Sequence, residues 1–403
     1  MRILVLGGGG REHALCWKLA QSKGVEVFAT PGNPGIAQIG TCLPAGVSYL
    51  KLAEEIEADL TVVGPEAPLV TGVVDQFRAA GRKIVGPAQS AAQLEGSKIF
   101  AKHFFAQREI PTAEYVTVDN PADARKALER FSYPVVLKAD GLAAGKGVII
   151  ANDRAEAEAA IVTLTGRLVI EEFLVGEEVS FIALCDGKNV VPLAPTQDHK
   201  AVFDGDTGPN TGGMGAYCDS AILTEQQTQE VLDRVIYPTV EATGFTGFLY
   251  AGLMMTDAGV KVLEFNVRLG DPETQPLMYR MASDFVPVLV AAATGELAGV
   301  KLEWKPGPTV CVVMASGGYP GAFENGKIIG GIAEAEAAGT TVFHAGTRTT
   351  DGALTTAGGR VLGVTAGGQT LSQAIEQAYR GATEIHFDGM HYRKDIGRKG
   401  LAR

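Results

Sequence analysis

The sequence predicts a mixed α/β and α+β protein with three parts: an open parallel-sheet domain, a larger middle region and a small C-terminal αβ domain. Three observations carry this prediction. The first hundred residues alternate short apolar runs with helical segments, which is typical of parallel βα units. The middle region contains alternating strands joined by glycine-rich loops. The residue pattern changes after the Pro- and Gly-rich segment Lys305-Pro306-Gly307-Pro308, which marks the start of the third part, with strands and a helix of its own.

The composition restricts the classes of protein that fit. The chain has 403 residues, with 35 Lys and Arg against 46 Asp and Glu, so its net charge is −11. An acidic chain is a poor partner for nucleic acid, although a local cluster of Lys and Arg is enough for a small phosphorylated ligand. Five scattered cysteines without a C-x-x-C pair predict free thiols in a reducing compartment. Since the sequence has no apolar run of the length of a membrane span, we expect a cytoplasmic protein without nucleic-acid or membrane partners.

The first strand ends in a glycine-rich turn. An apolar run from Ile3 precedes four glycines, Gly7 to Gly10, and then a helix begins. The dinucleotide fingerprint G-x-G-x-x-G fails because Glu12 stands at its third glycine. The next strand, Val25–Ala29, lacks a following acid to bind a ribose hydroxyl. Two interpretations stay open for this Rossmann-like domain: the turn binds an anion with its free N–H groups, or the glycines serve tight packing alone.

Further βα units complete the first domain, which we place at residues 1–100. We expect helices at 50–57, 70–80 and 88–107 and strands at 60–63 and 84–87. The loops after the strands are rich in Gly and Pro, and ligands bind at the carboxyl ends of strands in open parallel sheets. Lys98 lies in the last of these helices, where a lone lysine is usually a solvated residue.

A lysine-bearing strand and a glycine-rich loop open the second domain. The strand ends near Lys138, and the loop Gly141–Gly147 leads to a return strand. Glycines let the backbone approach phosphates, and Lys138 and Lys146 supply charge. The loop is not a Walker A loop, because Gly145 follows after three residues rather than four and Gly147 stands where the Mg²⁺-binding Ser or Thr would be. We interpret it as a flap that closes over a nucleotide.

Residues 168–174 form the next expected strand, after a short helix at 155–164. Its backbone has groups that read an adenine edge, and Glu178 follows where a carboxylate accepts ribose hydroxyls; a solvated face is the equal alternative for these glutamates. The polar segment 197–216 is rich in glycine and too long to be a simple connector.

A β-hairpin carries the most informative polar face of the chain. Residues 248–255 and 261–268 pair through a turn, and strand alternation puts Glu264, Asn266 and Arg268 on one face, roughly 6.6 Å apart. A carboxylate beside a carboxamide provides hard oxygen ligands for Mg²⁺ that also holds a polyphosphate. The arginine can neutralise charge on a transferred phosphoryl group or an acyl oxygen. The alternative is an edge strand with a polar solvent face.

The order of lysine strand, flap, adenine strand and Glu-x-Asn-x-Arg strand resembles the ATP-grasp architecture, in which two α+β subdomains clamp ATP. The whole chain more closely resembles the phosphoribosylamine–glycine ligases, or glycinamide ribonucleotide synthetases. The matching motifs run from one end of the chain to the other: Gly8–Ala14, Val63–Leu69, Leu94–Lys98, Lys138–Gly147, Gln197–Lys200, Asp206–Ala216 and Gly270–Gln275. The chain departs from the family at three places: Leu269 replaces a usual Phe, the segment 164–168 is shortened, and 250–253 lacks the further acidic metal ligand of many ATP-grasp enzymes.

This resemblance implies ATP-dependent ligation of glycine to 5-phosphoribosylamine in de novo purine (IMP) biosynthesis. The implied products are glycinamide ribonucleotide, ADP and phosphate, formed through glycyl phosphate, with ATP and Mg²⁺ (or Mn²⁺) as cofactors. The implied ATP-grasp domain spans 101–305, with a mobile flap subdomain at about 118–175, and the C-terminal domain spans 306–403; we expect a monomer.

The resemblance also implies residue roles. The metal ligands are Glu264 and Asn266, and the catalytic residues are Arg268 and Lys146. Nucleotide binding falls to Lys98, Lys138, Gly145, Gly147, Glu171 and Glu178. Substrate binding falls to Gly9, Gly10, Arg11, Glu66, Asp198, Lys200, Gly213, Asp271 and Glu273.

Three other functions stay open as alternatives. An ATP-grasp ligase that carboxylates or formylates a ribonucleotide is disfavoured by the motifs at 197–200 and 271–275. A nicotinamide dehydrogenase is disfavoured by the broken glycine fingerprint and the missing acid. A non-catalytic nucleotide sensor is disfavoured because Glu264, Asn266, Arg268 and Lys138 are all intact.

Overall fold

A five-stranded parallel sheet forms the N-terminal part of the computed structural model, which describes residues 1–142 and 147–402. Its strand order is β3-β2-β1-β4-β5, and every pairing is parallel, as the sequence predicts. The strands are β1 (Arg2–Gly7), β2 (Glu26–Pro31), β3 (Thr41–Cys42), β4 (Leu60–Val63) and β5 (Ile84–Val85). The helices are α1 (Gly10–Leu19), α2 (Tyr49–Glu55), α3 (Glu66–Val70) and α4 (Val73–Ala79).

Two helices expected to be continuous are each broken once. The helix expected at 70–80 is interrupted at Gly72, whose φ of 86° is left-handed and ends α3 before α4 begins. The helix expected at 88–107 is divided into α5 (Gln89–Gly96) and α6 (Lys98–Gln107). Ser97 separates them because its side chain accepts a hydrogen bond from the N–H of Phe100 and so caps α6. The break places Lys98 at the first turn of a helix, facing the middle of the molecule.

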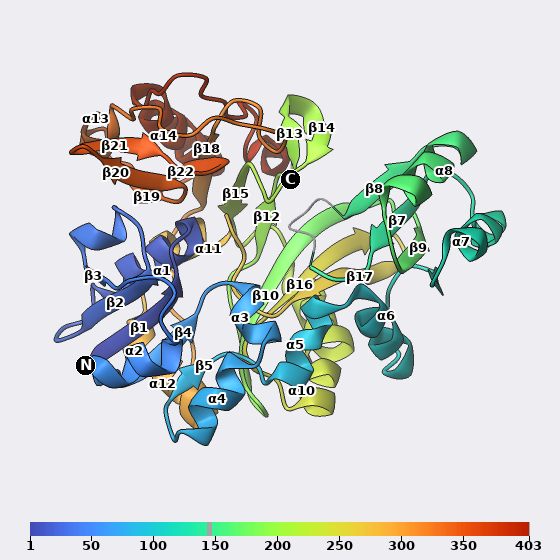
Figure 1. Cartoon of the computed structure of the whole chain (residues 1–403), viewed down its shortest axis with the longest axis horizontal. Coiled ribbons are helices and arrows are strands. Elements are labelled where there is room, and N and C mark those ends of the chain that lie inside the picture. The colour runs from blue at the N-terminus through green and yellow to red at the C-terminus, as the bar shows by residue number, and fades with distance from the viewer. Residues whose placement is uncertain (143–146, 403) are drawn as a thin grey trace.

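A four-stranded antiparallel sheet forms a separate lobe that extends to one side (Figure 1). Its order is β6-β9-β7-β8, with β6 (Tyr115–Val118), β7 (Val135–Ala139), β8 (Val148–Ala151) and β9 (Leu168–Glu172). Helices α7 (Pro121–Ala127) and α8 (Arg154–Thr163) pack on the sheet and enclose an apolar cluster of the lobe's own. The lysine strand and its return strand are therefore neighbours in an antiparallel pair, as predicted.

The largest sheet runs through the rest of the molecule and has nine strands. Its main path is β17-β16-β10-β12-β15-β18-β22-β19, and β11 pairs with β10. From the middle region come β10 (Glu177–Asp186), β11 (Val190–Pro192), β12 (Thr196–Asp198), β15 (Gly215–Cys218), β16 (Thr246–Thr256) and β17 (Gly259–Asn266). The C-terminal part adds β18 (Thr309–Ala315), β19 (Thr341–His344) and β22 (Arg360–Gly367). The C-terminal strands thus continue the central sheet through the β15–β18 pairing.

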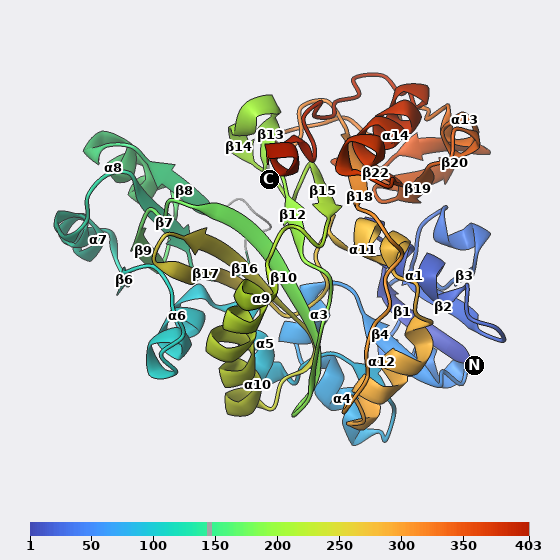
Figure 2. The same cartoon turned by 180° about the vertical axis from the view of Figure 1, so that it is seen from behind.

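Helices cover both faces of this sheet. Seen from behind, α9 (Glu225–Val231) and α10 (Tyr237–Thr243) lie over β10, β16 and β17 (Figure 2). The remaining helices are α11 (Thr274–Arg280), α12 (Phe285–Thr294), α13 (Ile332–Ala337) and α14 (Leu371–Glu384). Two small hairpins, β13 (Ala201–Phe203) with β14 (Thr207–Asn210) and β20 (Thr347–Thr350) with β21 (Ala353–Thr356), stand off the main path.

The N-terminal and C-terminal parts are held together by buried polar contacts. The N–H of His344 donates to Nδ1 of His13 at 2.7 Å, and Asn33 Nδ2 donates to the His344 carbonyl at 2.8 Å. Helix α11 also packs on α1. These contacts fix the glycine-rich turn after β1 against the C-terminal strands.

The structure confirms the prediction of free thiols, since all five cysteines are unpaired. Within residues 1–142 and 147–402, we find no helix with both the length and the apolar character that a membrane crossing requires.

Candidate active site

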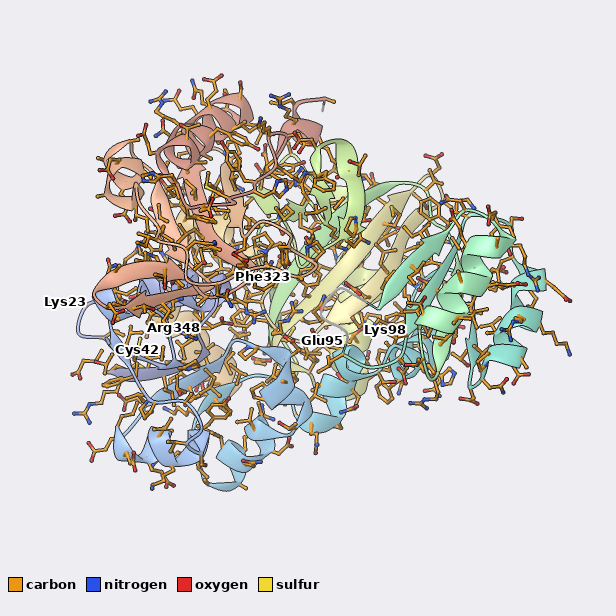
Figure 3. The ribbon with its side chains drawn as sticks, turned by 45° about the horizontal axis from the view of Figure 1, so that its top comes forward. Lys23, Cys42, Glu95, Lys98, Phe323 and Arg348 are labelled. Atoms are coloured by element: carbon orange, nitrogen blue, oxygen red, sulfur yellow. The ribbon has the colours of Figure 1, made fainter. Side chains whose placement is uncertain are left out.

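A cavity of about 490 Å³ lies between the four-stranded lobe, the hairpin β16–β17 and the N-terminal part. Twelve of the residues proposed from the sequence line it: Arg11, Glu66, Lys98, Lys138, Gly147, Asp198, Lys200, Glu264, Asn266, Arg268, Asp271 and Glu273. They come from segments more than 250 residues apart. Figure 3 labels Glu95 and Lys98, from α5 and α6, near the middle of the molecule at this cavity. Gly145 and Lys146 lie outside the described residues.

A β-bulge aims Glu264 into the cavity. Gly252 pairs with Glu264 and Leu253 with Val262, so Leu263 has no partner and β17 carries one extra residue. Glu264 and Asn266 both line the cavity beyond the bulge. Burial raises the pKa of Glu264, but the charges of the surrounding lysines outweigh burial and hold it below its usual value: Lys200, Lys138 and Lys98. Glu264 therefore presents an ionised carboxylate to the cavity.

Arg268 lies just past the end of β17, in a network of carboxylates. Its Nη2 is 2.8 Å from Glu95 Oε1 and donates to Asn266 Oδ1 at 2.9 Å, and its Nε is 3.4 Å from Glu66 Oε2. Burial lowers the pKa of Arg268, and these carboxylates raise it above its usual value. Glu95 also accepts the Val267 N–H at 2.8 Å. The guanidinium is thus fixed beside Asn266 with its charge intact.

Glu95 was not among the residues proposed from the sequence, although it lies in the recognised motif Leu94–Lys98. The motif therefore pointed to this region, but a glutamate next to the last residue of a helix has no local pattern that reveals its distant arginine.

Two lysines of the cavity share one buried glutamate. Glu171 forms ion pairs with Lys138 and with Lys102, the latter at 2.5 Å. It lies behind the cavity wall, where it balances two positive charges. Lys102 was missed from the sequence; burial lowers its pKa to about 8, and Glu171 opposes that shift. Lys98, in front, donates to the Gly141 carbonyl at 2.9 Å, so it contacts the base of the flap loop.

The end of the cavity near the C-terminal part is rich in carboxylates. Glu273 Oε1 accepts hydrogen bonds from Tyr250 Oη at 2.8 Å and Ser180 Oγ at 3.0 Å. Burial raises the pKa of Asp198 to about 7, with Lys200 opposing the rise and Glu273 adding to it. A cluster of buried acidic groups favours a cationic ligand group such as an ammonium.

Glu178 and Gly213 lie beside this end rather than on the cavity wall. The side chain of Glu178 is 44% exposed and lies 3.1 Å from Lys200, which it holds in place. Gly213 has a φ of 113°, and an added Cβ would meet the ring of Pro272, so the position requires glycine.

The glycine-rich turn after β1 encloses a carboxylate of the chain itself. Glu12, 3% exposed, accepts the N–H of Gly9 at 2.6 Å and the Nε–H of Arg11 at 2.6 Å. An added Cβ at Gly64 would meet the Glu12 side chain, so this glycine makes room for it. An added Cβ at Gly10 would likewise meet the side chain of Gln275, so this glycine makes room for Gln275. The N-terminus of α1 is thus neutralised internally, which favours the packing interpretation of the turn.

We expect Glu12→Ala to lower the free energy of unfolding by roughly 3 kcal/mol, because it leaves the buried Arg11 without its carboxylate. Glu12→Gln should lower it less, since the amide oxygen still accepts the Gly9 N–H. Denaturant titration measures both. Glu26→Ala is the matched control, because Glu26 is an exposed residue 3.7 Å from Arg2. Equal losses in the Glu12→Ala and Glu26→Ala variants would contradict the internal cap.

A second cavity, of about 770 Å³, opens between the glycine-rich turn and the hairpin β20–β21. Gly9 and Asn33 line it from the N-terminal part and Arg348 and Arg360 from the C-terminal part. Cys42 of the N-terminal part and Arg348 of the C-terminal part both line this second cavity, and Figure 3 shows them away from Glu95 and Lys98.

A pair of lysines beside Gly141 and Gly147, an opposing hairpin with Glu264, Asn266 and Arg268, and a separate antiparallel lobe define the site of an ATP-grasp enzyme. Family models then match almost the whole chain: the N domain of phosphoribosylglycinamide synthetase at 1–95, its ATP-grasp (A) domain at 96–274 and its C domain at 309–399. The chain therefore belongs to the phosphoribosylglycinamide synthetase family, as the sequence motifs predict.

Relatives and solved structures agree with this membership. The chain is 51% identical to phosphoribosylamine–glycine ligases of Pseudomonas aeruginosa and Escherichia coli K12, over 100% of this chain and 99% of each relative. The crystal structure of phosphoribosylamine–glycine ligase from Thermotoga maritima matches with a TM-score of 0.86 and 36% identity, covering 98% of this chain and 100% of that one. A biotin carboxylase domain from Hydrogenobacter thermophilus, solved with MgADP, shares the fold at a TM-score of 0.72 and 16% identity, covering 97% and 91% of the two chains.

Proposed function

We propose that this chain ligates glycine to 5-phosphoribosylamine at the expense of ATP, forming glycinamide ribonucleotide, ADP and phosphate in purine biosynthesis. One observation carries the proposal. In a chain of this family, a single cavity contains two lysines suited to phosphate, a hairpin with oxygen ligands suited to a hard cation, and an end rich in carboxylates. The alternatives of a dehydrogenase and a sensor give no reason for this combination.

ATP and a divalent cation fit the residues of the first cavity. Lys98 and Lys138 would neutralise phosphate oxygens, with the flap base at Gly147 closing over them. Glu264 is ionised and Asn266 has a carboxamide oxygen, the donor set that suits Mg²⁺ (or Mn²⁺) shared with phosphate. When bound, the cation spreads the negative charge of the phosphate chain. Glu171 would act from behind, by holding Lys138 in place.

The chain's own residues then bind and orient the reacting groups. The glycine carboxylate attacks the γ-phosphorus, giving ADP and glycyl phosphate, and Arg268 stabilises the charge on the transferred group. The amine attacks the acyl carbon, phosphate leaves with the electron pair of the C–O bond, and the amine loses one proton. The flap, including Lys146, excludes water that would hydrolyse the acyl phosphate. Positioning and electrostatics carry the rate without a protein nucleophile.

Glycine and the amine substrate would enter from opposite sides of the Asp271 loop. We place the glycine ammonium at the acidic end, near Asp198 and Glu273, where the cavity favours a cation. The phosphoribosylamine would lie in the second cavity, along Gly9 and the crevice in front of Asp271. Because Glu12 already occupies the Gly9 N–H and the Arg11 Nε, a phosphate in this crevice would have to bind beside the turn rather than inside it.

The remaining proposals concern the setting of the enzyme. A net charge of −11 and five free thiols support a cytoplasmic protein acting on small molecules, without nucleic-acid or membrane partners. We also propose a monomer with domains at 1–100, 101–305 and 306–403.

The test is release of ADP with ATP, Mg²⁺, glycine and freshly made phosphoribosylamine, omitting each component in turn. We expect turnover that requires both glycine and the amine. Turnover with bicarbonate or formate in place of glycine would move the chain to the carboxylating or formylating ligases. Tight ATP binding without turnover would instead favour the nucleotide sensor.

A further inference from the structure

One ion pair forms the boundary between the two cavities. Of the residues that the structure describes, Asp271 and Arg360 are the two that line both cavities. Arg360 Nη2 is 3.0 Å from Asp271 Oδ2, and Arg360 Nη1 donates to the Asp271 carbonyl at 2.6 Å. Asp271 follows the β17 hairpin strand, whereas Arg360 opens β22 of the C-terminal part. The pair therefore connects the hairpin end of the first cavity to the C-terminal wall of the second.

The same guanidinium holds a third segment of chain. Arg360 Nη1 also donates to the Gly212 carbonyl at 2.6 Å and lies 3.4 Å from the Gly213 carbonyl. The Gly212 N–H donates to the hydroxyl of Tyr319, at 3.0 Å. The glycine-rich loop before β15 is thus fastened to the C-terminal part through two side chains.

The fork shape of arginine is what allows these contacts together. Its two terminal nitrogens reach a carboxylate and the carbonyls of two separate loops, which a lysine ammonium on a flexible stem does not reproduce. The neighbouring Gly212 leaves little slack, since an added Cβ would lie 3.0 Å from the Arg360 Cζ. Burial lowers the pKa of Arg360, but the nearby acidic groups, Asp271 foremost, together raise it by more, so the pKa lies above its usual value and the charge is retained.

We propose that Arg360 is a positioning residue for amine transfer, a role that rests on the proposed function. Arg360 fixes the Asp271 loop and the Gly212–Gly213 loop relative to each other, and so sets the path by which the amine in the second cavity meets the acyl carbon in the first. When this path is misaligned, water takes the place of the amine. Water then adds to the acyl carbon, phosphate leaves, and glycine is regenerated while ATP is spent.

The experiment measures ADP and glycinamide ribonucleotide together in the wild type, Arg360→Lys and Arg360→Gln, with glycine and phosphoribosylamine present. The wild type should form about one ADP per ribonucleotide. In both variants we expect several ADP per ribonucleotide and product formation about a hundredfold slower, because a small misplacement of reacting groups has an effect of that size. The KM for ATP should stay within about twofold, since the phosphate-binding lysines do not contact Arg360. Arg380→Lys, on the exposed side of α14, is the matched control.

A merely structural role would slow ADP and ribonucleotide formation in parallel and leave their ratio at one, and that result would overturn the proposal. An unchanged amine KM with an unchanged ratio would overturn it as well. If neither Arg360 variant folds, as judged by thermal unfolding, Asp271→Asn breaks the same ion pair and should raise the same ratio. Absence of wild-type turnover would count against the proposed function itself. Failure of the proposed function is therefore distinguishable from failure of the role proposed for Arg360.

Discussion

Glu264→Gln is expected to lower turnover about a thousandfold, the equivalent of roughly 4 kcal/mol of transition-state stabilisation. The amide keeps the shape of the side chain but removes a negative charge that three lysines face: Lys98, Lys138 and Lys200. With Mg²⁺ as the cation, the rate of ligation should stay low at every accessible ATP concentration, because the amide binds a hard cation weakly. Steady-state kinetics with varied Mg²⁺ and ATP measure the effect.

The control for this variant is Glu230→Gln. Glu230 pairs with Arg234 at 2.9 Å on the exposed face of helix α9 and the turn that follows it. Exposed pairs of this kind contribute little to stability, so turnover should stay within about twofold of the wild type. Full turnover in Glu264→Gln, with normal Mg²⁺ dependence, would show that the cation is held elsewhere.

Arg268→Met is the second large effect, and it should lower both turnover and stability. Turnover should fall about a hundredfold to a thousandfold, since the charge next to the transferred group is lost. The free energy of unfolding should fall by roughly 3–5 kcal/mol, because Glu95 and Glu66 lose their buried partner. The double variant Arg268→Met/Glu95→Gln separates these roles: it should recover much of the stability and none of the turnover. Recovery of turnover would mean that Arg268 serves only to hold Glu95.

The stability deficit of Arg268→Met should depend on pH. Burial already raises the pKa of Glu95, and Arg268 is the main charge that opposes this rise. A carboxyl whose folded pKa lies above its unfolded value stabilises the fold at low pH and loses that contribution as the pH rises through the folded pKa. Denaturant titrations should therefore show a larger deficit near about pH 8 than near about pH 5. A deficit independent of pH would contradict the pairing of Glu95 with Arg268.

The sequence predicted much of the site because its periodicity is local. Alternation in the hairpin was enough to put Glu264, Asn266 and Arg268 together, and all three line the cavity. It did not reveal the bulge at Leu263, because a bulge is a property of two paired strands rather than of one. The helix break at Ser97 did have a local cause, a capping hydroxyl, and was missed by treating 88–107 as one pattern.

The residues that balance charge were the hardest to predict. Glu12, Glu95 and Glu171 neutralise arginines and lysines that line or flank the cavity, but each is a single acid whose partners are set by packing. The glycine-rich turn shows the difference: the four glycines left open an external anion or tight packing, and the carboxylate that accepts the Gly9 N–H belongs to Glu12 of the chain itself. The sequence pattern also did not predict that the C-terminal strands join the central sheet, because alternation identifies a strand but not the strand that it pairs with.

The continuity of the central sheet affects how the chain folds during synthesis. β15 is complete at Cys218, yet one of its edges has no partner until β18 emerges about ninety residues later, and β18 in turn waits for β22. A growing chain therefore carries an open sheet edge while most of its residues have already left the ribosome. Open edges pair readily with other chains, so this interval is where aggregation competes with folding. The C-terminal part thereby covers the exposed edge of β15 as well as one end of the active-site cavity, and strands made late protect those made earlier from aggregation.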